Sequence, residues 1–189
     1  MRAEARIEQS PVAARLAQVG EPLAAPLTRG VARELLSGRS LRLGHAMHPM
    51  LTDLPIGLWT SSFILDVAGG RDARRTSQRF VGLGLLTALP AALSGASDWA
   101  SDPEPEVQRV GAVHAVGNLL ATFAYLRSWL ARHRDHHAAG VAWGLAGATF
   151  ATAAGHLGGH LVLRLGAGNG PRDAEPPRLS QFTAHSDCG

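Results

Sequence analysis

The sequence of 189 residues contains no lysine and one cysteine, Cys188, which is next to last in the chain. A single cysteine excludes an internal disulfide and any metal site built from cysteine thiolates. The first nine residues alternate charged and small side chains without an apolar run, so we expect no secretory signal there. Only 17% of the residues are charged and 5% are aromatic. The charges are concentrated between apolar segments.

Several classes of function lack their signatures. The formal net charge is +3 and the sequence pI is near 10.3, but the arginines flank apolar segments and form no basic stripe interleaved with aromatics. We therefore expect no nucleic-acid partner. The sequence has no glycine-rich phosphate loop, no Ser/His/Asp arrangement and no pair of catalytic carboxylates. We expect no enzyme active site in this chain, although an enzymatic role stays open.

Four apolar segments follow one another, each near the roughly 20 residues that cross a hydrocarbon core. They run over residues 49–70, 80–97, 107–130 and 138–165, and short charged loops join them. The predicted fold is all-α: a four-helix transmembrane bundle over residues 44–168, a polar N-terminal arm over 1–43 and a disordered tail over 169–189. The alternative is a soluble helical protein with a buried core, for which four such segments leave too little polar surface.

Two finer patterns concern the arm and the fourth segment. In the arm, Val12, Leu16 and Val19 have helical spacing, which fits either short surface helices or disorder. In the fourth segment, two neighbouring rows of small residues predict close helix packing. The rows are Gly140, Gly144, Ala148 and Thr152, and Gly147, Ala151, Gly155 and Gly159.

Ionisable residues gather towards one side of the predicted membrane. Four antiparallel spans place the arm, the second loop and the tail on the same side. That side receives His45, His48, Asp53, His114, His156 and His160. With a rise of about 1.5 Å per residue, His114 lies about 8 Å from Arg109 and His156 about 12 Å from Arg164, so these two histidines are at similar depth. Polar groups in lipid turn inward, so we expect these histidines to converge. Asp66 lies near the opposite side, where we expect it to pair with the arginine-rich loop 71–79. The tryptophans, Trp59, Trp99, Trp129 and Trp143, are expected as interfacial anchors.

Three interpretations of the converging histidines compete. In the first, two of His48, His114 and His156 are axial ligands of haem b, and Arg109 or Arg164 pairs with its propionates. In the second, His45, His48, Asp53, His114, His156 and His160 supply the ligands of zinc or copper. In the third there is no cofactor, and the histidines hydrogen-bond to neighbouring helices, each bond worth on the order of 1 kcal/mol. We favour a cofactor or metal, with haem first.

Five ordered motifs resemble a known family. They are Gly44-His45-x-x-His48-Pro49, Asp53-Leu54-Pro55-Ile56, Gly95-x-x-Asp98-Trp99, Val113-His114 and Gly158-Gly159-His160-Leu161-Val162. Together, over residues 44–168, they resemble the membrane family called domain of unknown function 2231. The resemblance implies a bacterial four-helix membrane protein without an established activity. Its relatives are often joined to Rieske-type iron–sulfur domains, which implies membrane redox chemistry, but a single cysteine holds no two-iron cluster.

The sequence thus predicts a multi-pass protein of the bacterial inner membrane, a haem- or metal-binding redox accessory subunit. The runner-up is a structural or assembly membrane protein without a cofactor. The expected partners are the lipid bilayer and a separate iron–sulfur or cytochrome redox protein, with self-association into a homo-oligomer left open. Membrane orientation also stays open, because arginines occur on both sides.

Overall fold

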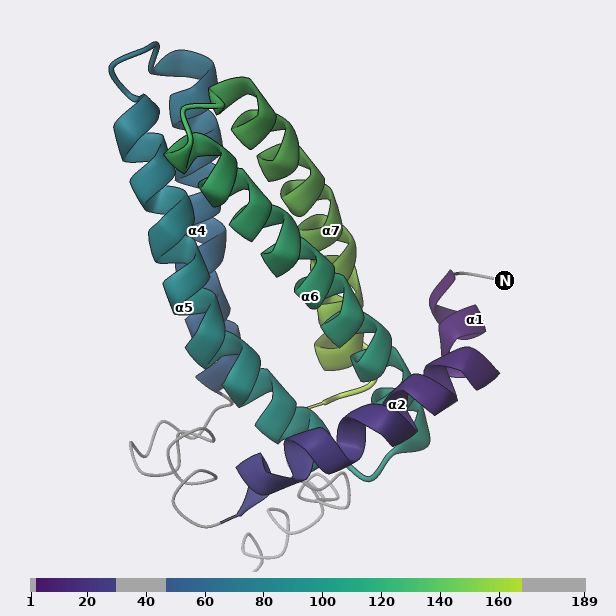
Figure 1. The fold of residues 1–189 in the computed structure, drawn as a ribbon. Helices are drawn as coiled ribbons and strands as arrows, with labels where there is room; N and C mark the ends of the chain where they lie inside the picture. Colours follow the sequence, from purple (N-terminus) through teal and green to yellow (C-terminus); the bar gives the residue numbers. More distant parts are fainter. Residues whose placement is uncertain (1–2, 30–46, 168–189) are drawn as a thin grey trace, which may run out of the picture.

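The computed structural model describes residues 3–29 and 47–167, and its regular elements over these ranges are all helical (Figure 1). This confirms the predicted all-α class. Three short elements come from the arm: α1 (Ala3–Glu8), α2 (Pro11–Ala24) and the 3-10 helix η1 (Ala25–Thr28). Four long helices follow: α4 (Met47–Ala68), α5 (Arg74–Ala100), α6 (Pro105–His133) and α7 (His137–Leu163). Each long helix contains most of one predicted apolar segment.

The long helices alternate in direction and form two hairpins. The most extensive contacts join α4 to α5 and α6 to α7. Between the hairpins, α5 contacts α6 more extensively than α4 contacts α7. With a rise of about 1.5 Å per residue, the four helices are long enough for the thickness of a hydrocarbon core. The loop predicted over 71–79 is shorter than expected, since α5 already begins at Arg74.

The helix ends follow from the local sequence. The Ser10 hydroxyl accepts a hydrogen bond from the Ala13 N–H at 3.3 Å and caps α2, which begins with Pro11. Pro105 likewise begins α6 after the extended residue Glu104. Gly70 and Gly166 follow α4 and α7 with φ of 66° and 64°, a conformation in which a Cβ is unfavourable.

Helix α2 lies across the end of the bundle, against α6 and near the end of α5 (Figure 1). Its buried residues are small: Ala13, Ala17 and Ala24, with Gly20 against the Trp99 ring. The large aliphatic residues of α2 lie about a quarter-turn further round the helix and are exposed. They are Val12, Leu16, Val19 and Leu23, the last with 77% of its surface accessible. The arm is therefore helical over residues 3–8 and 11–28, as one of the two sequence interpretations held, and residues 30–43 of the arm lie outside the described ranges.

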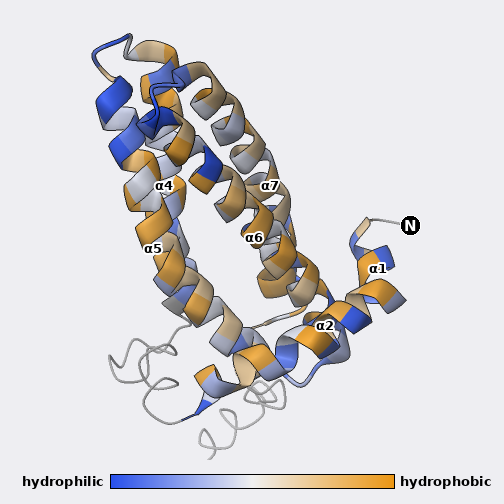
Figure 2. Ribbon diagram, in the orientation of Figure 1, coloured by the Kyte–Doolittle hydropathy of each residue, from blue (hydrophilic) through white to orange (hydrophobic). Residues whose placement is uncertain are grey.

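Many of the buried residues of the bundle are small, and most of its large aliphatic residues are outside. Its buried positions include Gly84, Ala91, Ser94, Ala121 and Ala154, whereas many leucines and phenylalanines on all four helices are exposed. Figure 2 shows hydrophobic residues along the lengths of the helices and many hydrophilic residues at the end where α4 is connected to α5. Among the helices in the described ranges, α5 alone is long and apolar enough to cross a membrane by length and composition.

The small residues of α7 contact α6 with a different spacing from the predicted one. The contacting row is Gly140, Gly147 and Ala154, seven residues apart, and all three are buried. Gly155 and Gly159 of the predicted second row face open space, with no atom within 4 Å of an added Cβ. The prediction that both rows pack against helices is therefore wrong for these two glycines.

Candidate functional site

His48 lies in the first turn of α4 and is fixed against α5. Its Nδ1 lies 2.8 Å from the Ala91 carbonyl oxygen. Because a carbonyl only accepts, Nδ1 carries the proton and Nε2 has a free lone pair. Gly95 makes this packing feasible, since a Cβ there would approach the ring to 2.6 Å.

His114 of α6 is fixed against α7 in the same way. Its Nδ1 lies 2.8 Å from the Ala154 carbonyl oxygen, so Nδ1 donates here too. A Cβ at Gly158 would lie 3.0 Å from the ring. The Nε2 accepts a hydrogen bond from the Asn118 amide at 2.9 Å. This contact is one turn along α6, as the sequence spacing predicts.

The two imidazoles lie close together where the hairpins meet, in a T-shaped arrangement. Their centroids are 6.4 Å apart and their planes are inclined by 89°. Two imidazoles on opposite sides of one ion, with bonds of about 2.0 Å, have centroids roughly 6 Å apart. A metal-binding histidine commonly donates its other ring N–H to a carbonyl, and both rings do so here. These tautomers and this separation are compatible with one metal ion between the rings, but His114 Nε2 is already hydrogen-bonded to the Asn118 amide.

His156 and His160 point away from this pair. They lie about 200° around α7 from Ala154 and Gly158, and they bind the arm. His156 Nε2 is 2.7 Å from Glu4 Oε1, and His160 Nε2 is 2.7 Å from Glu8 Oε1. The hydrogen bond from His156 holds the pKa of Glu4 below its ordinary value of 4.5. The four histidines form two separate groups, contrary to the predicted convergence.

The other predicted site residues are dispersed. His45 lies outside the described residues, and Asp53 is exposed on α4. Arg109 donates to the Glu8 carbonyl oxygen at 2.6 Å, and Arg164 is exposed at the end of α7. Within residues 3–29 and 47–167, no three His, Cys, Asp or Glu side chains lie close enough to hold a metal ion. A six-ligand site is therefore not formed by the described part of the chain.

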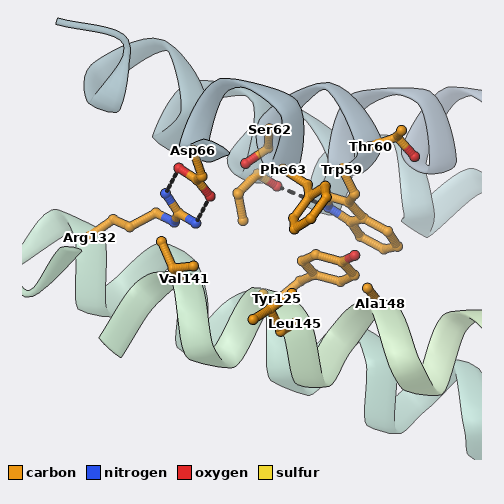
Figure 3. Close-up of a pocket in the computed structure, with 12 residues that line it drawn as sticks. Trp59, Thr60, Ser62, Phe63, Asp66, Tyr125, Arg132, Val141, Leu145 and Ala148 are labelled. Atoms are coloured by element: carbon orange, nitrogen blue, oxygen red, sulfur yellow. Dashed lines mark hydrogen bonds and ion pairs between the residues drawn. The ribbon is translucent and has the colours of Figure 1, made fainter. Parts of the chain in front are cut away.

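The opposite end of the bundle contains a buried ion pair that the sequence did not predict (Figure 3). Arg132 of α6 binds Asp66 of α4 through two contacts, Nη1–Oδ1 at 2.8 Å and Nη2–Oδ2 at 2.6 Å. Both side chains are almost fully buried. Hydroxyls complete the network: Ser77 contacts Asp66 at 2.6 Å, and Ser128 accepts from Arg132 Nε at 3.2 Å. The prediction that Asp66 pairs with an arginine of loop 71–79 is wrong: its charged partner is Arg132 of α6, and segment 71–79 contributes the Ser77 hydroxyl.

Two stacked aromatic rings separate the ion pair from the histidines. Trp59 and Tyr125 have centroids 3.9 Å apart and planes within 12°. Trp59 donates from Nε1 to the Val81 carbonyl oxygen at 3.3 Å. The residue is therefore a core residue, and the expectation that it anchors the membrane interface is wrong. A cavity of about 120 Å³ next to the stack lies between α4 and α7, lined by Phe63, Asp66, Arg132 and Leu145 among others (Figure 3).

One protein family matches most of the chain. Residues 44–171 match the family described as "Predicted membrane protein (DUF2231)". The chain belongs to this family. The match begins just before His48 and ends after α7, so it covers the four long helices and leaves α1 and α2 outside. No curated protein and no solved structure matches the chain.

Proposed function

We propose that this DUF2231 protein crosses the bacterial inner membrane four times, through α4 to α7. The exposed aliphatic side chains around the bundle support this, because water-exposed patches of that extent are unfavourable in a soluble monomer. The polar residues that lower the mean hydropathy of α4 and α6 include Asp66 and Arg132. These two charges neutralise each other inside the bundle and need not contact lipid.

The exposed stripe of α2 fits the same arrangement. In this proposal α2 lies in the membrane interface, with Val12, Leu16, Val19 and Leu23 in the acyl boundary. The small residues of α2 contact the protein and the large ones face outward. A helix that covers the apolar core of a water-soluble protein has the reverse arrangement. Arg15, Gln18 and Glu21 occupy the remaining side, where they remain in water.

The function that the site supports best is binding of a redox-active transition metal by His48 and His114, as an accessory subunit of a separate redox protein. The single observation that carries this proposal is that each Nδ1 donates to a backbone carbonyl, at Ala91 and Ala154. Both rings thus have the tautomer of a neutral Nε2 ligand. Either a bare ion or the iron of haem b uses two such ligands. His114 must exchange its Asn118 contact to bind either.

A structural role is the second candidate, and one contact favours it. The Asn118 amide already satisfies His114 Nε2 at 2.9 Å. If no metal displaces this amide, His114 joins α6 to α7 as a neutral hydrogen-bond bridge, and removing it lowers stability by about 1 kcal/mol.

One experiment separates the candidates. The full chain is purified in detergent, and its metal content and oxidised and reduced absorption spectra are measured. A haem gives a Soret band that sharpens on reduction, whereas copper or zinc appears only in the metal analysis. His114→Ala should abolish either signal, and His156→Ala, on the other side of α7, should leave it unchanged. Wild-type protein without haem or metal, even after loading with copper or zinc, would leave the structural role standing.

A further inference from the structure

The inward-facing residues of α4 recur in α6 at one constant separation. His48, Trp59, Ser62 and Asp66 correspond to His114, Tyr125, Ser128 and Arg132, each exactly 66 residues later. Three of these four correspondences are also direct contacts. The histidine rings are 6.4 Å apart, the aromatic rings stack at 3.9 Å, and the charged side chains form the ion pair. Three residues of α4 therefore contact their own counterparts in α6.

The partner helices repeat in the same manner. Helices α5 and α7 both have 27 residues, and each position of α7 lies 63 residues after one of α5. His48 binds the carbonyl of Ala91 and packs on Gly95, and His114 binds the carbonyl of Ala154 and packs on Gly158. Two further contacts correspond in the same way. Trp59 packs on Gly84, and its counterpart Tyr125 packs on Gly147. Ser62 hydrogen-bonds to Ser77, and its counterpart Ser128 hydrogen-bonds to the Gly140 carbonyl oxygen.

We infer that the bundle is a tandem duplication of one two-helix unit, and that His48 and His114 are equivalent ligands of one copper(I) ion on the two-fold axis between the units. Contacts between identical positions arise only at a two-fold axis. Because both hairpins begin at the same end of the bundle, this axis runs parallel to the helices. Paired repeats of this kind commonly place a site where the repeats meet.

The choice of copper(I) rests on the proposed metal function and on the number of ligands. Equivalent histidines contribute equal bonds from opposite sides, and the described residues add no third His, Cys, Asp or Glu. Zinc usually takes four ligands, whereas monovalent copper is stable between two collinear imidazoles. The centroid separation of 6.4 Å is close to the roughly 6 Å of such a collinear arrangement.

At one pair of equivalent positions the symmetry is broken in a compensating way. Phe63 of α4 corresponds to Trp129 of α6. Phe63 lies opposite Leu145 of α7, and Trp129 lies opposite Gly82 of α5. The larger ring faces the glycine and the smaller ring shares the cavity lining with the leucine. The cavity lies between α4 and α7, the interface that corresponds to the better packed one between α5 and α6.

Ligand equivalence is tested by copper affinity. The full chain in detergent is loaded anaerobically with copper(I) and titrated with a coloured copper(I) chelator. We expect one ion per chain. Because His48→Ala and His114→Ala each remove one of the two ligands, each should weaken binding by more than the roughly 100-fold that loss of an outer-shell partner costs, and by similar factors. His156→Ala is the matched control and should change nothing. If the copper(I) affinities of the two variants differ by more than about tenfold, the equivalence of the two histidines is overturned, although metal binding itself is not. Haem or zinc in place of copper would overturn the choice of ion, and no metal at all would also overturn the proposed function.

The duplication has a test that needs no metal. In the exchange variant Trp59→Tyr with Tyr125→Trp, equivalent positions swap their side chains and the stack is restored on the same two glycines. We expect its melting temperature to lie within about 4 °C of wild type and above that of each single variant. A double variant less stable than both singles would overturn the two-fold relation.

Discussion

At the scale of single residues, the main polar groups of the bundle each have a hydrogen-bond or ion-pair partner on a neighbouring helix. The hydrogen bonds of His48 and His114 go to backbone carbonyls, and Asp66 and Arg132 bind each other. Such groups are stable in a low-dielectric interior only as complete pairs, since a lone buried charge is unfavourable.

The ion pair gives a prediction about stability. Asp66→Asn leaves the Arg132 guanidinium buried without a counter-charge, and unfolding in mixed micelles should show a loss of about 3 to 5 kcal/mol. The double variant Asp66→Leu with Arg132→Met removes both charges and should recover most of that loss. A single variant that costs less than about 1 kcal/mol would mean that water reaches the pair.

At the scale of helices, small residues decide how closely α6 and α7 approach. Helical periodicity alone identified the correct residue type in α7 but not the correct face, because the sequence contains glycine and alanine on more than one side. Which face of α7 packs against α6 depends on the size of the α6 side chains opposite it. Arg132 and Tyr125 of α6 need space at Gly140 and Gly147, whereas Gly155 has no neighbour to accommodate.

Two leucine substitutions in α7 test this choice. Gly147→Leu places a large side chain where even a Cβ would lie 2.9 Å from the Tyr125 ring. We expect a loss of 1 to 3 kcal/mol or more, roughly the cost of overpacking a core, measured by thermal unfolding in detergent. Gly155→Leu is the control and should melt near wild type, because its Cβ faces open space. Equal destabilisation by both would contradict the assigned face.

At the scale of the whole molecule, the proposed arrangement is four spans with α2 in the interface at one end. The alternative is a single membrane span, α5, which is the one described helix that is both long and apolar enough to cross a membrane. The two arrangements differ in where the loops lie. With four spans, the α4–α5 and α6–α7 connections share one side of the membrane and the α5–α6 connection is on the other.

The single cysteine makes this topology measurable. In a Cys188→Ser background, single cysteines replace Asp72, Ser101 and His136 in turn, and intact cells are treated with an impermeant maleimide. Four spans predict that Asp72→Cys and His136→Cys react from the same side and Ser101→Cys from the other. Leu23→Cys on α2 should react faster with a lipid-soluble maleimide than with the impermeant one. If Ser101→Cys and His136→Cys share a side, the chain has a single span.

The sequence by itself determined the helical class, the four apolar helices and the family, because helical periodicity, apolar length and ordered motifs are properties of the chain. It also placed His48 and His114 among the candidate residues. Only the tertiary structure decided that these two meet while His156 and His160 turn to Glu4 and Glu8. Rotation of each helix about its axis depends on every neighbour at once. The same reason explains Arg132, which the sequence presents as one more arginine at a helix end. Asp66 reaches it only because the two hairpins place equivalent positions face to face.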